Sequence, residues 1–250
     1  MAPSKKDDQR GHRGRLREKY LAQGLDSLTD QEVIELLLTL STPLRDCKPM
    51  AREAVRRFGN LRGVLAADPA ELAEVDGLGP RNILPLRLIQ DTARRFLRDK
   101  LLDRDFLHSA REVFDYLYQA LRDRKSEVFQ VIFLNAKNGV LAVEEPFQGG
   151  AVSSFVDIQV VVGRALALNA AGLVCAHNHP SGQPQPSDGD VKVTRELVLA
   201  CKAVGLKLVD HLIIGENRYF SFSEGGHIKR FEDEFETFKR SPAQPNRITR

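Results

Sequence analysis

The chain has 250 residues, of which 42% are hydrophobic and 28% are charged, an ordinary balance for a soluble globular protein. Its formal net charge is only +3, which excludes a strongly basic or acidic protein, and most of the basic excess precedes Tyr20. No apolar run approaches the roughly 18 residues of a membrane span, and the polar N-terminus does not resemble a secretory signal. Three cysteines without a C-x-x-C pair predict reduced thiols, so we expect a cytoplasmic protein that has no membrane partner.

The first 101 residues predict a tail followed by helices. Residues 1–15 are polar and basic, and we expect them to be disordered. In "TDQEVIELLLTL", Thr29 is placed to cap a helix and Glu32 to complete a capping box. The segments "KPMAREAVRRFGN", "DPAELAEV" and "RNILPLRLIQDTARRFLRDK" continue the helical spacing of apolar residues, so residues 16–101 predict an all-helical domain. The charged stretch from Arg98 to Asp105 is a candidate linker.

Between two of these helices lies the stretch "EVDGLGPRN", in which Gly77 and Gly79 flank Leu78. Glycines allow a backbone to approach a ligand closely, and amides at a helix N-terminus can bind phosphate. The stretch resembles a helix-hairpin-helix element, which implies contact with a DNA backbone through Gly77, Gly79 and Arg81. A plain tight turn between packed helices is the alternative.

After the linker, helices and strands alternate, which predicts an α+β domain with a mixed sheet over residues 106–225. Ser109 is the expected cap of the first helix, and "NAKNG" predicts a turn between two strands. A helix at "VDIQVVVGRALALNAAG" and a buried strand at "LVCAHNH" follow, and the next helix is capped by Ser187 or Asp188. Strands at "KLVDHLIIG" and "YFSFSE" complete the domain, and residues 226–250 predict a mostly disordered tail with a short helix at most.

The stretch "LVCAHNHPSGQPQPSDGD" contains the candidate metal ligands. Residues i and i+2 of an extended segment point the same way, so His177 and His179 can reach one ion together. A constrained Pro/Gly loop can return the chain to them at Asp190. Two imidazoles, one carboxylate and an open position form the arrangement of catalytic zinc, Zn²⁺, at one ion per chain. A buried core histidine beside a surface loop is the alternative.

The spacing His177-x-His179-x7-Ser187-x2-Asp190 matches the JAMM motif of the MPN metalloprotease superfamily. With "HNHPSG" and "DH" at Asp210-His211, the chain resembles the RadC family of bacterial proteins over about residues 15–225. The resemblance implies a JAMM/MPN fold, a mixed sheet flanked by helices that is similar to cytidine deaminases. It also implies that the two histidines and the aspartate hold zinc, and that Ser187 hydrogen-bonds the metal water or the oxyanion.

The resemblance further implies a glutamate upstream of a strand as the general base. Glu127 directly precedes an apolar strand and is the preferred residue, with Glu144 and Glu145 on the next strand as alternatives. Asp210 and His211 adjoin another apolar strand. They are candidates for orienting a ligand histidine, or they form a buried structural pair.

Three functions are weighed from these features. The first is a zinc hydrolase that cleaves peptide or isopeptide bonds of a protein or peptide substrate, with zinc-activated water and Glu127 as the base. The second is a non-catalytic DNA-associated protein with structural zinc, linked to DNA repair only by the family's name. The third, a nucleobase deaminase, requires H-x-E with C-x-x-C, and this chain has neither. The sequence indicates neither the substrate nor the oligomeric state.

Overall fold

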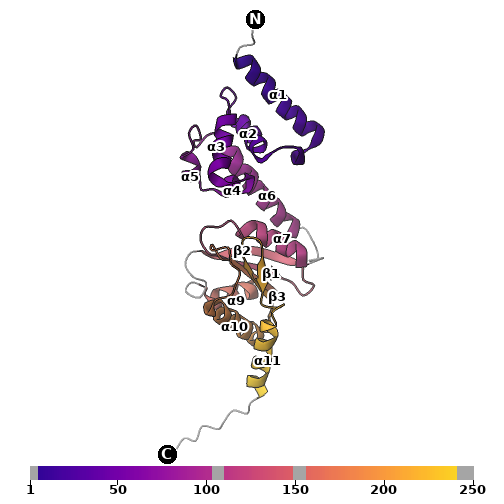
Figure 1. Cartoon of the computed structure of the whole chain (residues 1–250). Coiled ribbons are helices and arrows are strands. Elements are labelled where there is room, and N and C mark those ends of the chain that lie inside the picture. The colour runs from indigo at the N-terminus through magenta and orange to yellow at the C-terminus, as the bar shows by residue number, and fades with distance from the viewer. Residues whose placement is uncertain (1–4, 103–109, 149–155, 241–250) are drawn as a thin grey trace, which may run out of the picture. The chain divides into compact units, whose positions relative to one another are not determined.

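The computed structural model describes residues 5–102, 110–148 and 156–240. The chain divides into two compact units, Met1–Arg95 and Phe96–Arg250, whereas the sequence predicts domains at 16–101 and 106–225. Figure 1 shows helices alone in the first unit and a sheet with helices in the second. The α+β class predicted from the sequence is therefore confirmed.

The first unit consists of short helices around one apolar core. They are α1 (Lys5–Gln23), the 3-10 turn η1 (Leu25–Ser27), α2 (Asp30–Ser41), α3 (Lys48–Phe58), α4 (Leu61–Ala66), α5 (Pro69–Ala73) and the start of α6 (Leu84–Leu102). The predicted capping box at α2 is confirmed, because the Thr29 side chain accepts from the Glu32 amide and the Glu32 side chain accepts from the Thr29 amide. Ile34, Leu38 and Leu86 are fully buried in the core.

Two expectations about the first half are corrected. Residues 5–15 belong to helix α1 and not to a disordered tail; Leu16 on that helix is buried against Leu28 and Val33. The candidate linker is also wrong over residues 98–102, because α6 continues to Leu102. Residues 103–109, which include the predicted cap Ser109, lie outside the described residues.

The second unit is built on a five-stranded mixed sheet. Its elements are α7 (Ala110–Leu121), β1 (Val128–Leu134), β2 (Val140–Gln148), α9 (Ile158–Ala167), β3 (Gly172–Asn178), α10 (Asp188–Ala203), β4 (Lys207–Ile214), β5 (Tyr219–Ser221) and α11 (His227–Arg240). The strand order is β2-β1-β3-β4-β5, and only β3 and β4 are parallel. The predicted hairpin between β1 and β2 is confirmed.

Both faces of the central strands are covered. Alternate residues such as Phe129, Leu173 and Cys175 pack in a core with residues of α9, α10 and α11. The opposite residues, such as Ile132 and Val174, pack in a second core with residues of α7. A strand buried on both faces reads as a continuous apolar run, so a polar side chain at its end occupies a position enclosed by the core.

The disordered tail predicted for residues 226–250 is also corrected. Residues 227–240 form the 14-residue helix α11, whose Ile228 and Phe231 are buried in the same core as α10. Residues 241–250 lie outside the described residues. Within the part of the chain that the structure describes, no helix is long and apolar enough to cross a membrane.

Candidate metal centre

The site lies at the end of the central strand β3. His177 pairs with Phe129 of β1 on one side and with Ile213 of β4 on the other, and its side chain is fully buried. The strand ends at Asn178, and the His179 amide then donates to the Ile214 carbonyl. The two histidines therefore follow the strand alternation that the sequence predicts, with Asn178 between them on the opposite face.

The loop after His179 is held against the turn between β4 and β5. The Gly182 amide donates to the His179 carbonyl at 2.9 Å, and the Gly182 carbonyl accepts from the Glu216 amide at 3.0 Å. Gly182 has a φ of +76°, and a Cβ on Gly215 would stand 2.5 Å from the Gly182 oxygen. Glycine is therefore required on both sides of this contact, which fixes how the loop returns to α10.

Ser187 and Asp190 form the capping box of helix α10. The Ser187 hydroxyl accepts from the Asp190 amide at 3.2 Å and donates to Asp190 Oδ2 at 2.7 Å. The Ser187 amide donates to the same Oδ2 at 2.8 Å. Asp190 Oδ2 is thus held by the helix start, and this leaves Oδ1 facing His177.

Two imidazole nitrogens and one carboxylate come together at the site. His177 Nε2 lies 3.1 Å from His179 Nε2 and 3.2 Å from Asp190 Oδ1, and His179 Nε2 lies 3.4 Å from Asp190 Oδ2. Ligands bound to tetrahedral zinc at about 2.0–2.1 Å stand about 3.3 Å apart. The spacing of these atoms therefore fits a tetrahedral ion, and the three residues form a group that can hold a metal.

Each histidine has its other ring nitrogen engaged. His179 Nδ1 lies 2.8 Å from the Gln183 carbonyl, which can only accept, so this nitrogen carries the proton. His177 Nδ1 lies 2.9 Å from Nε2 of the buried His211. In both rings Nε2 is therefore the nitrogen that faces the cluster.

Burial and the cluster itself set the charges. Burial lowers the pKa of His177, although the negative charges of the neighbouring Asp190 and of Glu127 oppose this. The hydrogen bond to Asp190 raises the pKa of His179. Burial alone would raise the pKa of Asp190, but the two neighbouring histidine rings and the hydrogen bond from Ser187 hold it well below its usual range. The carboxylate is therefore ionised and His177 is neutral, which are the states that metal ligands need.

Glu127 is half-buried and directly precedes β1, and its charge acts on both ligand histidines. The backbone around it is held by Asn178, which sequence reasoning did not single out. Asn178 Oδ1 accepts from the Val128 amide at 2.9 Å, and Nδ2 donates to the carbonyls of Arg124 and Ser126 at 3.0 and 3.1 Å. The residue between the two histidines thus fixes the segment that carries Glu127.

The alternative glutamates are paired elsewhere. Glu144 forms an ion pair with Arg164 at 2.7 Å, and Glu145 forms one with Arg124 at 3.2 Å. The charge on Glu127, in contrast, raises the pKa of both His177 and His179. These ion pairs and the effect of Glu127 on the histidines favour Glu127 over the two alternatives.

The two neighbours Asp210 and His211 point to opposite faces of β4. His211 is fully buried and contacts His177. Asp210 instead accepts from the Ser221 hydroxyl at 2.6 Å and from the Ser223 amide at 2.9 Å, and it lines a separate cavity of about 580 Å³ beside α7. Of these two candidates for orienting a ligand histidine, His211 contacts His177, whereas the Asp210 carboxylate is held by Ser221 and Ser223.

The predicted hairpin lies between α5 and α6 in the first unit. Gly77 has a φ of +85°, and its carbonyl accepts from the Asn82 side chain at 2.6 Å. The Gly79 amide, which was expected to contact phosphate, donates to Asn82 Oδ1 at 2.6 Å. The turn is therefore closed by its own asparagine.

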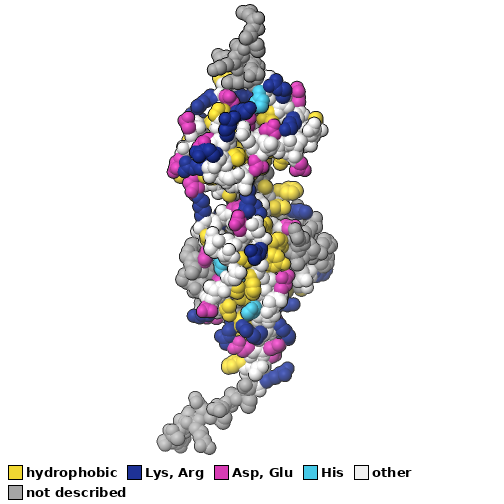
Figure 2. Space-filling view, in the orientation of Figure 1, with side chains coloured by type: hydrophobic (Ala, Val, Ile, Leu, Met, Phe, Trp, Pro, Cys, Tyr) yellow, Lys and Arg dark blue, Asp and Glu magenta, His cyan; other side chains and the backbone are white. Residues whose placement is uncertain are grey.

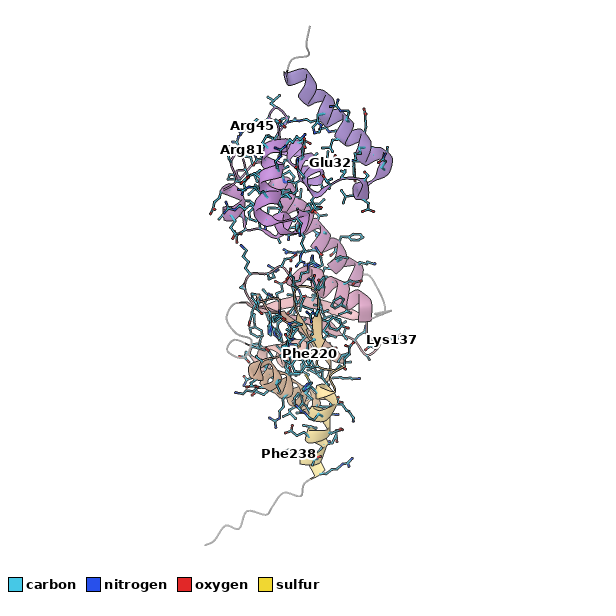
Figure 3. All side chains as sticks on the ribbon, viewed as in Figure 1. Glu32, Arg45, Arg81, Lys137, Phe220 and Phe238 are labelled. Carbon is cyan, nitrogen blue, oxygen red and sulfur yellow. The ribbon has the colours of Figure 1, made fainter. Side chains whose placement is uncertain are left out.

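Basic side chains adjoin this hairpin. Arg45 Nη2 lies 3.5 Å from the position of a Cβ on Gly77, and neither Arg45 nor Arg81 has an acidic partner within the described ranges. Both are labelled in Figure 3. In the view of Figure 2, however, acidic and basic side chains alternate over the helical unit, so the visible face carries no large field of one sign.

Both halves of the chain match models of known protein families. The model of the RadC-like JAB domain matches residues 107–227, and the UPF0758 N-terminal model matches residues 10–84. A UPF0758 protein of Rhodobacter capsulatus is 41% identical over 211 residues, 84% of this chain and 99% of the relative. UPF0758 proteins of Ruegeria pomeroyi and Fusobacterium nucleatum are 40% and 36% identical, over 88% and 90% of this chain and 98% and 100% of the relatives.

Proposed function

The chain belongs to the RadC family, also called UPF0758, and on this premise we propose that it is a zinc-dependent hydrolase of the metallopeptidase and isopeptidase class. The observation that carries the proposal is the convergence of His177 Nε2, His179 Nε2 and the Asp190 carboxylate at 3.1–3.4 Å. This spacing and this mixture of nitrogen and oxygen donors suit zinc, and three protein ligands leave a position for water or substrate.

A zinc ion held by these side chains would supply Lewis acidity towards a carbonyl oxygen and lower the pKa of a water molecule to about 7. In the proposed reaction, Glu127 accepts a proton as the water oxygen bonds to the carbonyl carbon of an amide. It returns this proton to the nitrogen as the C–N bond breaks, which yields a carboxylic acid and an amine. Ser187 keeps the Asp190 carboxylate in place, because its amide and its hydroxyl both donate to Oδ2.

The approach to the site supports a substrate from solution. The side chain of His177 is fully buried, whereas that of His179 is 15% exposed. Glu127 is half-buried, so the face with His179 and Glu127 is the open one. A structural zinc site has four protein ligands and is closed, so an accessible three-ligand site with an adjacent carboxylate favours catalysis.

Metal analysis tests this proposal. Purified protein should contain about one zinc ion per chain, and His179→Ala should lose it. Glu127→Gln should keep the zinc and lose hydrolysis of peptide and isopeptide substrates, which makes it the matched blank for a substrate screen. Wild-type protein that takes up no zinc after supplementation would overturn the assignment, and full activity in Glu127→Gln would move the base to another residue.

DNA binding through the helical unit is the second candidate function, and the unpaired Arg45 and Arg81 beside the hairpin favour it. The engaged Gly79 amide speaks against amide contact with phosphate, so the arginines would have to carry the interaction. Arg45→Ala with Arg81→Ala should then weaken binding to duplex DNA and reduce its salt dependence. Equal affinity of wild type and double variant would exclude this surface.

A further inference from the structure

A buried chain of hydrogen bonds connects helix α10 to the ligand His177. Thr194 Oγ1 lies 2.6 Å from the Asp190 carbonyl oxygen and 2.7 Å from His211 Nδ1. His211 Nε2 in turn lies 2.9 Å from His177 Nδ1. The side chains of Thr194, His211 and His177 are all 0% exposed, so no water competes for these bonds.

The donors and acceptors fix the direction of this chain. A carbonyl oxygen has no proton, so the single hydroxyl proton of Thr194 goes to the Asp190 carbonyl. Thr194 Oγ1 can then only accept, and the proton between it and His211 belongs to His211 Nδ1.

The surroundings of His211 determine the direction of the next hydrogen bond, between His211 and His177. Its ring stacks on Phe222 at 5.1 Å and meets the edge of Phe129 at 5.5 Å, and an apolar enclosure of this kind favours the neutral imidazole. A neutral ring with its proton on Nδ1 presents a bare Nε2. His177 Nδ1 must therefore donate to it, which leaves the His177 Nε2 lone pair free and facing Asp190.

We propose that Thr194 is a positioning residue for the metal centre, because its hydroxyl selects the tautomer of His211 and thereby keeps the ligand nitrogen of His177 unprotonated. The inference rests on the proposed function only in taking His177 as a zinc ligand. Without the hydroxyl, His211 Nδ1–H has no acceptor, and the ring can move its proton to Nε2. That proton would face His177 Nδ1 and drive the proton of His177 to Nε2, the nitrogen that faces the cluster.

The geometry also explains why Thr194 lies where it does. It follows Asp190 by one helical turn, so the i−4 carbonyl that takes its hydroxyl proton belongs to the predicted ligand itself. A threonine in a helix commonly makes such a bond. Here the bond uses the only hydrogen-bond donor of the Thr194 side chain. Thr194 Oγ1 therefore accepts from His211, which in turn contacts the predicted ligand His177.

The test compares variants of the full chain. Thr194→Val keeps the shape but removes the hydroxyl, and it should weaken zinc affinity by about 10–100-fold in competition with a chelator. Thr194→Ser retains the hydroxyl and should bind zinc like the wild type. Thr237→Val is the matched control, because Thr237 makes the same i−4 bond, to the Asp233 carbonyl, at an exposed position of α11 outside the second unit's metal ligands. It should leave zinc affinity unchanged.

A second measurement includes a test on the wild type alone, which does not depend on whether a variant folds. Long-range ¹⁵N–¹H NMR of the zinc-free wild type should show protons on Nδ1 of both His211 and His177, and Thr194→Val should move both towards Nε2. A wild-type His211 that carries its proton on Nε2, or a Thr194→Val variant that binds zinc like the wild type, would overturn the proposal. A wild type that binds no zinc but shows both Nδ1 protons would instead refute the proposed hydrolase and leave the hydrogen-bond direction intact.

Discussion

Replacing Asn178 by alanine should destabilise the protein and displace Glu127 without removing a predicted metal ligand. Asn178 is fully buried and makes three hydrogen bonds to the backbone of residues 124–128. The alanine variant deprives the Val128 amide and two carbonyls of these partners in an enclosed place. Each such loss costs about 1–3 kcal/mol when the group is left unsatisfied, and water that enters the vacated space offsets part of it.

We therefore expect the free energy of unfolding to fall by about 2–4 kcal/mol, measured by urea denaturation of the zinc-free chain. Asn135→Ala is a suitable control. Asn135 Oδ1 accepts from the amides of Lys137 and Gly139 in the β1–β2 turn, so its loss also removes bonds from a side chain to the backbone. This turn lies at the opposite end of β1 from Glu127, so the control should lose stability without altering the site.

Two further readouts separate the role of Asn178 from general stability. Hydrogen exchange at the Val128 amide should accelerate in Asn178→Ala and remain slow in Asn135→Ala. Zinc affinity should stay near the wild-type value in both variants, because the ligand atoms lie on other residues. An unfolding free energy of Asn178→Ala within about 0.5 kcal/mol of the wild-type value, the range of an ordinary surface substitution, would refute the reasoning.

Other residues give shorter predictions. Ser187→Ala should lower zinc affinity and cost about 1 kcal/mol of stability, read from chelator competition and denaturation, because the cap of α10 and a bond to Asp190 are both lost. At Glu32, the hydrogen bond from Lys19 lowers the pKa of the carboxyl group below 4.5. The ionised Glu32 therefore stabilises the folded chain above pH 4.5, and this stabilisation is lost as the pH falls through the pKa of Glu32 in the folded state. The stability difference between wild type and Glu32→Gln should accordingly shrink on acidification, and a constant difference would contradict this. Burial raises the pKa of Cys201 to about 12, so a thiol reagent at pH 8 should label this residue only after denaturation, and rapid labelling of the native chain would show that the core is open.

Sequence patterns predicted the elements that local rules control. The capping box at Thr29 and Glu32 and the turn at "NAKNG" are properties of a few adjacent residues, and both are present. The first part of helix α1 and the full length of helix α11 were missed because their segments are mostly charged. Each helix is held in the fold by very few apolar residues, such as Leu16 in α1 and Phe231 in α11. Their stability depends on partners distant in sequence, which periodicity within a segment does not show.

At the candidate metal centre, too, the sequence predicted local features but not contacts between distant residues. Strand alternation predicted that His177 and His179 would converge, and the structure brings them together with Asp190. The direction of Asp210 was missed because neighbouring residues on a strand point to opposite faces, and the sequence does not say which face of β4 meets His177. Thr194 and Asn178 carried no sequence signal, because their importance comes only from the donors and acceptors that the fold places beside them.

The spacing of the motif then follows from ordinary secondary structure. H-x-H is the two-residue repeat of a strand: the histidines take one face, and the residue between them can hold the segment with Glu127 from the other. S-x-x-D is the spacing of a capping box, in which Ser187 turns the Asp190 carboxylate back over the helix start. The loop between them need only bring one strand end to one helix start, and the contact of Gly182 with Gly215 sets that distance. A substitution that preserves the four motif residues but adds a side chain at Gly215 should therefore impair zinc binding as severely as the loss of a ligand, because the loop could no longer return Asp190 to the histidines.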